Sequence, residues 1–302
     1  MGVYYFNITY RCNSNCIFCA ANHPIDNDNR EMLLEDFEQI LIRNNVNEND
    51  LVIINGGEPT IHRNFWAFLD AINNLKASID LFSNGKLFKN PAFVRRITQY
   101  SNIHIRIPLF GSTAELHDRL TGMSGNFNDT TQGLDLLCQY ICKNITLEIK
   151  LLLSRATVLE NERIYDLIKS RWLGKGVRIS LNPLLISECV IQQKEIMMDT
   201  YENLMIKSEP LIKKALSDGI DFSVSLIPYC SFPNRELIEK CCGRNCGGNM
   251  FYADPNCTKT LDHLSQRKSC NKCYYISRCN GFPKNYISYY GEEVIKPFIN
   301  SI

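Results

Sequence analysis

Short apolar runs recur along much of the chain, and each is rich in β-branched and aromatic residues. They cover residues 3–9, 50–55, 78–83, 103–109, 145–153 and 176–182. Runs of this length and composition are typical of buried parallel strands. Between them apolar residues follow helical spacing, as in Phe65, Phe68, Leu69 and Ile72. The pattern predicts the α/β class, with six strand-helix repeats that curl into a partial barrel of parallel strands.

The pattern changes beyond about residue 195. A long helical stretch is followed by a strand-like run, 223–230, and then by a tail rich in Cys and Gly. We therefore expect a barrel over residues 1–220 and a small Cys-rich domain over residues 221–302. In parallel α/β folds the functional groups lie on the loops that follow the strands.

Composition and charge narrow the classes of partner. Hydrophobic residues make up 45% of the chain and charged residues 22%, as in ordinary soluble proteins. The net charge is +1, so we expect no nucleic-acid partner. No stretch approaches the roughly 18 apolar residues of a membrane span, and the N-terminus does not have the pattern of an export signal. We expect a cytoplasmic protein with no membrane partner.

Cysteine is the unusual feature of the composition. The chain has 14 of them, gathered near the N-terminus and in the tail. In a chain with no export signal, so many thiols indicate metal binding or thiol chemistry rather than disulfides.

The first cysteines form a C-x3-C-x2-C loop directly after the first predicted strand. Its members are Cys12, Cys16 and Cys19. Iron-sulfur clusters usually take four thiolates, so three on one loop leave one iron open to another ligand. The alternative is a zinc site completed by a nearby histidine such as His23.

This loop resembles that of the radical S-adenosylmethionine (radical SAM) superfamily, which carries C-x3-C-x-aromatic-C after its first barrel strand, with Phe18 as the aromatic residue here. The resemblance implies a [4Fe-4S] cluster whose open iron binds S-adenosylmethionine. It also implies reductive cleavage of that cofactor to a 5'-deoxyadenosyl radical that abstracts hydrogen.

Two further loops are similar to motifs of this family. Gly56, Gly57, Glu58 and Pro59 end the second predicted strand and match its GGEP motif, where glycines allow close approach and the carboxylate accepts the cofactor's ammonium. Ser83 and Asn84 end the third strand, where the family contacts the cofactor. His117 and Asp118 either line the substrate entrance or make local caps.

The tail has the C-x2-C-x5-C spacing of the auxiliary-cluster domain called SPASM, or of its shorter relative twitch. Its members are Cys270, Cys273 and Cys279, and Pro283 stands where the full motif has another Cys. The resemblance implies one auxiliary [4Fe-4S] cluster, with Cys230 or Cys246 as fourth ligand.

Other interpretations of the tail remain open. If Cys230 is not a ligand, its thiol is a candidate hydrogen-atom donor, although no catalytic residue is assigned. The alternative for the whole tail is a structural zinc ribbon.

The resemblance favours an enzyme that modifies a peptide or protein, of the kind that matures ribosomally made peptides. It implies an external electron donor of the flavodoxin or ferredoxin type. The chain begins at the first barrel strand, so we expect no leader-binding domain before it. The alternatives are a radical SAM enzyme for a small molecule, such as a nucleotide or cofactor precursor, and a structural zinc-binding interaction protein.

Overall fold

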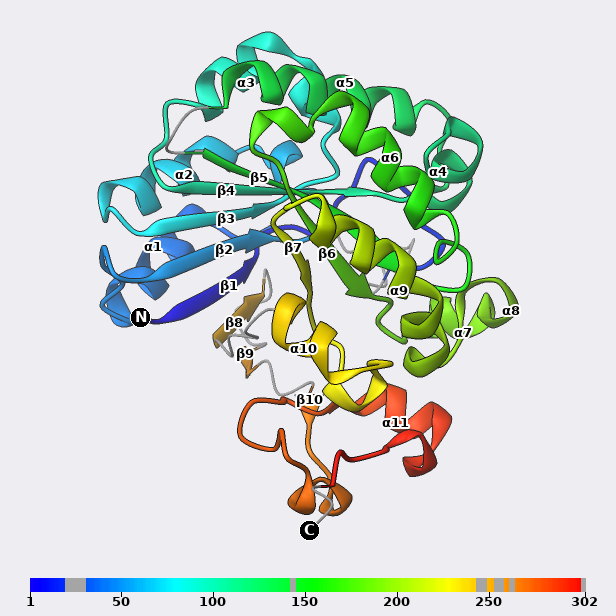
Figure 1. The fold of residues 1–302 in the computed structure, drawn as a ribbon. Helices are drawn as coiled ribbons and strands as arrows, with labels where there is room; N and C mark the ends of the chain where they lie inside the picture. The colour runs from blue at the N-terminus through cyan, green and yellow to red at the C-terminus, as the bar shows by residue number, and fades with distance from the viewer. Residues whose placement is uncertain (20–30, 142–144, 243–248, 253–257, 261–263, 300–302) are drawn as a thin grey trace.

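Seven parallel strands form one curved sheet and follow one another in chain order (Figure 1). The structure is a computed structural model, and it describes residues 1–19, 31–141, 145–242, 249–252, 258–260 and 264–299. The strands are β1 (Val3–Asn7), β2 (Leu51–Asn55), β3 (Ser78–Phe82), β4 (Ile103–Leu109), β5 (Ile145–Leu153), β6 (Arg178–Pro183) and β7 (Phe222–Val224). The predicted α/β class and the six expected strands are confirmed, and β7 adds a seventh.

Helices cover the outer face of the sheet (Figure 1). The principal ones are α1 (Leu34–Arg43), α2 (Phe65–Asn74), α3 (Pro91–Ile97), α4 (Ala114–Thr121), α5 (Asn126–Tyr140), α6 (Asn161–Arg171) and α9 (Tyr201–Ser217). Their apolar faces form the core with the strands. Phe37 of α1, for example, lies 4.4 Å from Phe6 of β1 and 4.7 Å from Phe68 of α2 between ring centroids. Burial of these apolar faces holds the helices on the sheet.

The inner face of the sheet carries polar side chains. Along β4, Ile103, Ile105 and Ile107 are buried, while His104 and Arg106 point to the opposite face because side chains alternate along a strand. The same alternation places charged or polar residues of β3, β5 and β6 on this inner face. The interior of the curved sheet is therefore not uniformly apolar.

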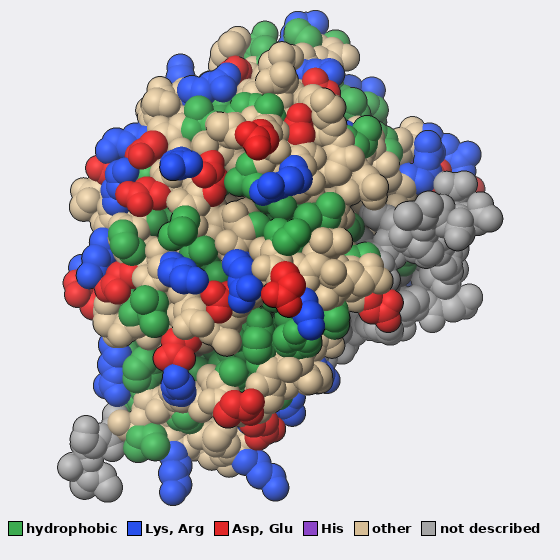
Figure 2. Space-filling view, turned by 90° about the vertical axis from the view of Figure 1, so that its right-hand side faces the viewer, with side chains coloured by type: hydrophobic (Ala, Val, Ile, Leu, Met, Phe, Trp, Pro, Cys, Tyr) green, Lys and Arg blue, Asp and Glu red, His purple; other side chains and the backbone are tan. Residues whose placement is uncertain are grey.

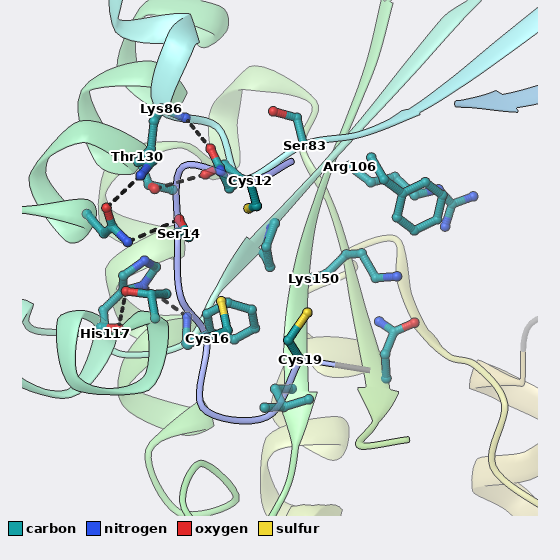
Figure 3. Close-up of a pocket in the computed structure, with 18 of the residues that line it drawn as sticks. Cys12, Ser14, Cys16, Cys19, Ser83, Lys86, Arg106, His117, Thr130 and Lys150 are labelled. Carbon is teal, nitrogen blue, oxygen red and sulfur yellow. Dashed lines mark hydrogen bonds between the residues drawn. The ribbon is translucent and has the colours of Figure 1, made fainter. Parts of the chain in front are cut away.

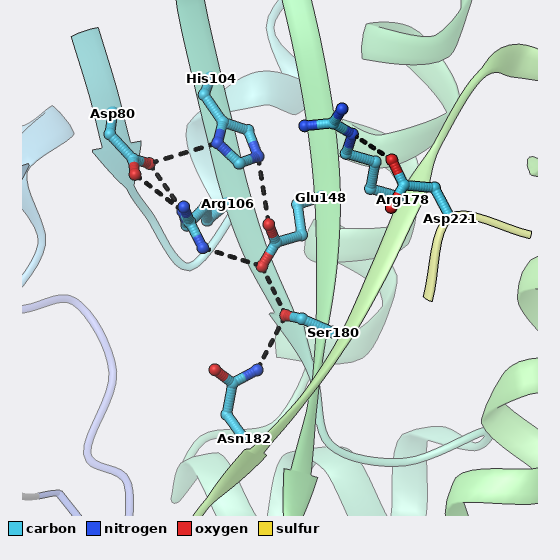
Figure 4. Close-up of polar contacts among 8 residues, drawn as sticks. All are labelled: Asp80, His104, Arg106, Glu148, Arg178, Ser180, Asn182 and Asp221. Carbon is cyan, nitrogen blue, oxygen red and sulfur yellow. Dashed lines mark hydrogen bonds and ion pairs between the residues drawn. The ribbon is translucent and has the colours of Figure 1, made fainter. Parts of the chain in front are cut away.

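These inner residues form one network across four strands (Figure 4). Arg106 Nε lies 2.7 and 3.0 Å from the carboxylate oxygens of Asp80, and its Nη1 lies 3.1 Å from Glu148. Ser180 donates to Glu148 at 2.5 Å, and His104 Nε2 lies 3.3 Å from it. Burial raises the pKa of Glu148, but His104, Arg106 and Ser180 outweigh burial and lower it to about 2. The Glu148 carboxylate is therefore ionised.

The C-terminal part of the chain adds strands at both edges of the sheet. β7 pairs with β6, whereas β8 (Asn249–Tyr252) pairs in parallel with β1 and antiparallel with β9 (Thr258–Thr260). A separate pair, β10 (Leu264–Ser265) and β11 (Phe282–Pro283), precedes α11 (Lys284–Tyr290). The domain boundary near residue 220 stays a prediction, and the sheet continues beyond it.

The strand-like run expected over 223–230 ends early. Only Phe222–Val224 forms β7, because Leu226 adopts a left-handed conformation (φ 61°) and Pro228 has no N–H for a strand ladder. A 3-10 turn over Tyr229–Ser231 follows and carries Cys230. This early end turns the chain away from the sheet.

The surface carries charges of both signs. On the face shown in Figure 2, acidic and basic side chains are interspersed. Within the described part of the chain, no helix has both the length and the apolar character needed to cross a membrane.

The inner network gives a stability prediction. Arg106→Met should lower the free energy of unfolding by about 3–5 kcal/mol, because it leaves two buried carboxylates without their cation. The matched control is Arg178→Met, whose pair with Asp221 is half exposed and should cost about 0–1 kcal/mol. Urea denaturation followed by circular dichroism measures both. Equal losses in the two variants would contradict this account of the network.

Candidate functional site

A cavity of about 300 Å³ opens beside the carboxyl ends of the strands, and Cys12, Cys16 and Cys19 line it. Figure 3 shows their sulfur atoms directed toward the same space. Cavities of this size are typical of small-ligand sites. The structure thus brings together the three thiols that the spacing singled out.

The cysteine loop is held by the end of α4. Asn15 N donates to Thr121 O at 2.9 Å, and Ile17 N donates to Leu120 O at 3.0 Å. The last carbonyls of a helix have no partner within the helix, so they are free to accept these bonds. A Cβ on Gly122 would come within 2.1 Å of Asn15 O, so the approach of loop to helix requires glycine there.

Polar side chains hold the opposite side of the same loop. Lys86 donates to Asn13 O and, at 2.9 Å, to Asn126 Oδ1. Asn126 donates to Ser14 at 3.2 Å, and Asn84 donates to Asn13 Oδ1 at 2.7 Å. Figure 3 shows Lys86 beside the part of the loop that carries Ser14. Residues after β3 and at the start of α5 therefore fix the loop between Cys12 and Cys16.

The GGEP segment packs against the residues just before Cys12. Gly57 N donates to Thr9 O at 2.7 Å, and Glu58 N donates to Arg11 O at 2.8 Å. A Cβ on Gly57 would lie 2.2 Å from Arg11 O, so no larger residue fits. Glycine is therefore needed at position 57 for the contact between the two backbones. Gly57 also lines the cavity.

Glu58 is buried, with 1% of its surface exposed. Its carboxylate accepts from Thr60 N at 3.1 Å, Thr60 Oγ1 at 2.5 Å, Ser83 Oγ at 2.8 Å and Asn84 N at 2.6 Å. Burial raises its pKa, and these donors oppose that shift. In this structure the carboxylate joins the loops after β2 and β3. Its expected contact with the cofactor stays a prediction.

The predicted cofactor residues differ in their placement. Gly57, Ser83 and Asn84 line the cavity, whereas Glu58 reaches it through Ser83 and Asn84. Pro59 is buried and begins a 3-10 turn, Pro59–Ile61. The ring of Phe18 lies edge-on to that of Phe110, which lines the cavity, at 4.9 Å between centroids.

His117 lines the cavity, and Asp118 makes a local cap. His117 Nδ1 accepts from Phe110 N at 3.2 Å, and burial lowers the pKa of His117 to about 4. Asp118 accepts from Gly125 N at 2.6 Å and from Phe127 N at 2.7 Å at the start of α5. Asp118 thus makes a local cap, and the role of His117 at the substrate entrance stays a prediction.

Several residues that line the cavity belong to no motif identified in the sequence. They are Lys86, Arg106, Lys150 and Asn182 among others. The last three occupy alternate positions within apolar strands, and that pattern of isolated polar residues was the available signal. Lys86 follows Gly85 in a turn, where polar residues are ordinary, so no pattern in the sequence marked it.

The donor set of the N-terminal cavity fits an iron-sulfur cluster. Burial raises the pKa of Cys12 to about 11 and that of Cys16 to about 12, and neighbouring thiolates add to the shift. Cluster ligands are deprotonated, so metal binding releases protons from these thiols. Three thiols on one loop supply three of the four usual ligands and leave one iron open.

A second, smaller cavity lies in the tail. Cys230, Cys270, Cys273 and Cys279 all line it, and its volume is about 20 Å³, enough for one water-sized group. Burial raises the pKa of Cys230 to about 11, and the three other thiols add to this. Cys246, the other expected fourth ligand, lies outside the described residues, as does His23.

The arrangement of the thiols bears on the kind of metal they suit. Within the described residues, no three Cys, His, Asp or Glu side chains are placed to share one metal ion. A zinc site needs four ligands about 2.0–2.3 Å from one ion, whereas a cubane cluster binds each thiolate to a different iron. Ligand sulfurs of a cluster therefore lie farther apart than those of a zinc site.

A family model decides the class of the N-terminal site. Residues 6–154 match the Radical SAM superfamily. They form a radical SAM domain. A [4Fe-4S] cluster and S-adenosylmethionine are accordingly the cofactors of this domain.

Curated relatives match shorter parts of the chain. Mycofactocin maturase MftC of Mycobacterium ulcerans is 27% identical over 132 residues, which are 44% of this chain and 35% of MftC. GTP 3',8-cyclase of Campylobacter jejuni subsp. doylei is 33% identical over 89 residues, 28% of each chain. The chain thus spans about a third of the length of these curated relatives.

A solved structure matches the fold over nearly the whole chain. Streptococcus suis SuiB bound to S-adenosylmethionine gives a TM-score of 0.68 at 13% identity, over 99% of this chain and 76% of SuiB. SuiB bound to precursor peptide SuiA gives 0.68 at 16% identity, over 99% and 75%. These similarities show a shared fold that extends beyond the radical SAM domain.

The N-terminal site gives a metal-content prediction. Changing Cys12, Cys16 and Cys19 together to Ala should remove about four irons per chain after anaerobic reconstitution, because one cubane loses its protein ligands. Cys138→Ala is the control, because this thiol is buried in the core on α5 and should leave iron unchanged. Iron analysis with protein quantitation measures both. Wild-type iron content in the triple variant would refute the assignment.

Proposed function

We propose that this protein cleaves S-adenosylmethionine reductively and uses the resulting radical to modify a peptide or protein substrate. The observation that carries the proposal is the meeting of Cys12, Cys16 and Cys19 in one cavity with Gly57 and Asn84. The cluster and S-adenosylmethionine together supply the radical that abstracts hydrogen. The protein supplies their position and the walls that exclude water.

The described residues suggest how each cofactor is held. Cys12, Cys16 and Cys19 ligate the cluster, and the bonds from Asn84 and Lys86 to Asn13 keep their loop in place. Gly57, Ser83 and Asn84, which line the cavity wall, would hold S-adenosylmethionine. Glu58 acts on that wall by fixing Ser83 and Asn84.

A peptide substrate is favoured by the relatives. MftC is named a maturase, and SuiB has been crystallised with a precursor peptide. The match to SuiB extends through the tail of this chain. A maturase and a structure with a precursor peptide both favour a peptide substrate, and maturation of a ribosomally made peptide is the reaction class that we propose.

A small-molecule substrate is the second candidate. It is favoured by the 33% identity to GTP 3',8-cyclase over 89 residues. A nucleotide would call for guanidinium groups free to bind phosphate. Arg106, which lines the cavity, is engaged by Asp80 and Glu148, and Arg96 lies over the ring of Trp66. Neither guanidinium is free, and the preference for a peptide rests on the relatives.

We also propose an auxiliary [4Fe-4S] cluster in the tail, with Cys230 as the fourth ligand beside Cys270, Cys273 and Cys279. The shared cavity of the four thiols supports this choice. The main chain of the tail holds these cysteines close together, since Cys273 N donates to Cys270 O at 2.8 Å. A cluster there requires the four side chains to rotate outward from a cavity of about 20 Å³.

Electrons must come from outside the chain, because neither cofactor supplies them. We propose an external donor of the flavodoxin or ferredoxin type. The test of the function uses the reconstituted chain under anaerobic conditions with dithionite and S-adenosylmethionine. Release of 5'-deoxyadenosine supports it, and a mass change in a small peptide encoded beside the gene identifies the substrate. No 5'-deoxyadenosine from protein with full iron content refutes it.

Glu58 gives a prediction for cofactor affinity. Glu58→Gln should weaken binding of S-adenosylmethionine, because an amide group cannot accept from Thr60, Ser83 and Asn84 as the carboxylate does. The loss should be about 1–3 kcal/mol. Titration calorimetry measures it, with Glu236→Gln, an exposed residue paired with Lys240, as control. Unchanged affinity in Glu58→Gln would separate this carboxylate from the cofactor site.

The tail gives a prediction that separates the two clusters. Changing Cys270, Cys273 and Cys279 to Ala should remove about four irons per chain. Release of 5'-deoxyadenosine should persist, because it needs only the N-terminal cluster, while substrate modification stops. Circular dichroism must first show a folded barrel, since lost ligands can unfold a small domain. A folded variant that modifies substrate at the wild-type rate would make the tail purely structural.

A further inference from the structure

The large cavity has cationic walls. Lys86, Arg106 and Lys150 line it, and no Asp or Glu of the described residues does so. Cationic side chains on the wall of a cavity attract an anionic ligand. Whether each cation can bind such a ligand depends on the partners it already has.

Two of the three cations are engaged by the protein itself. Arg106 forms ion pairs with Asp80 and Glu148 (Figure 4). Lys86 donates to Asn13 O and Asn126 Oδ1. These bonds fix Arg106 as part of the sheet and Lys86 as part of the support of the cysteine loop.

Lys150 on β5 is the remaining cation. Within the described part of the chain, its ammonium has no hydrogen bond or ion pair, and Nζ lies 4.5 Å from the ring centroid of Phe82. Burial and then Arg106 lower the pKa of Lys150 to about 8, and attraction from Glu148 and Asp80 does not offset this. At pH 7 most of the amine is protonated. Its three N–H donors therefore lack acceptors until a ligand provides them.

A neutral donor lies on the next strand. Asn182 of β6 lines the same cavity, and its Nδ2 donates to Ser180 Oγ at 2.8 Å. β5 and β6 pair in parallel with Lys150 opposite Ser180 and Leu152 opposite Asn182. The amide has a second N–H for which the described residues provide no acceptor. A cation and an amide on paired strands are suited to bind two oxygens of one carboxylate.

We propose that Lys150 and Asn182 form a carboxylate-binding site for the substrate, an inference that rests on the peptide-modifying function above. The substrate then presents an acidic side chain or its C-terminal carboxylate to this wall. The site accounts for the unpaired ammonium, since an occupied cavity supplies its missing acceptor. It also orients the substrate, because the carboxylate is fixed at the β5 and β6 side while the cysteines occupy the β1 loop.

Matched small probes test the site on the reconstituted chain. N-Acetylglutamate amide and N-acetylglutamine amide represent an acidic side chain and its neutral isostere. N-Acetylalanine and N-acetylalanine amide represent a C-terminal carboxylate and its neutral form. Calorimetry or thermal stabilisation at millimolar probe gives the affinities. The pair of probes with the larger ratio of acid affinity to amide affinity identifies which carboxylate the site binds.

The expected result is that one carboxylate probe binds about tenfold or more tightly than its amide, as expected for a charge-assisted hydrogen bond. The preference should persist in Lys150→Arg and disappear in Lys150→Met. Lys213→Met is the control for surface charge, because this lysine is exposed and paired with Glu209. Equal affinity for acid and amide, no binding of any probe, or a preference that survives Lys150→Met overturns the proposal.

S-Adenosylmethionine also carries a carboxylate, so a second titration assigns the site. Its affinity should change by less than about twofold in Lys150→Met, below the effect of losing a charged hydrogen bond. A loss of about tenfold that is absent with decarboxylated S-adenosylmethionine would assign Lys150 to the cofactor and overturn the substrate site. Release of 5'-deoxyadenosine by the wild-type chain tests the proposed function separately, so the two failures are distinguishable.

Discussion

The N-terminal site depends on hydrogen bonds that hold a loop without regular secondary structure. The loop from Cys12 to Cys19 cannot satisfy its own backbone groups, and buried groups left unpaired cost free energy. The end of α4 accepts from Asn15 and Ile17, while Lys86 and Asn84 bind Asn13. Three thiols therefore share one cavity because α4, α5 and the turn after β3 all converge on this loop.

Glu58 extends the same principle to the next two loops. Its carboxylate is buried, and four donors from Thr60, Ser83 and Asn84 surround it. Since Asn84 also binds the cysteine loop, the turns after β1, β2 and β3 are linked by one set of polar contacts. Burying a carboxylate is costly, and the four donors offset that cost while fixing the geometry of three loops. These contacts fix the turns after β1, β2 and β3 relative to one another.

The sequence predicted the strands and the loop cysteines, because both follow short-range patterns of burial and spacing. The sequence did not distinguish Cys230 from Cys246 as the fourth ligand of the auxiliary cluster. The choice depends on how the turn at Tyr229 meets the later cysteines, and spacing does not encode that contact. The contact of Glu58 with Ser83 depends on the register of β2 beside β3, which the GGEP motif alone does not encode. Lys150 was missed because a single polar residue in an apolar strand has no meaning until its neighbours on β4 and β6 are known.

The pairing of β8 with β1 joins segments 245 residues apart, since Tyr4 lies opposite Asn249. Tyr4 lies opposite Asn249 and Asn7 opposite Tyr252, so β1 gains this neighbour only after residues 249–252 have been synthesised. Contacts so distant in sequence form slowly, and an unpaired strand edge can bind other chains meanwhile. During translation the loop that carries Cys12 therefore extends from a strand with one open edge.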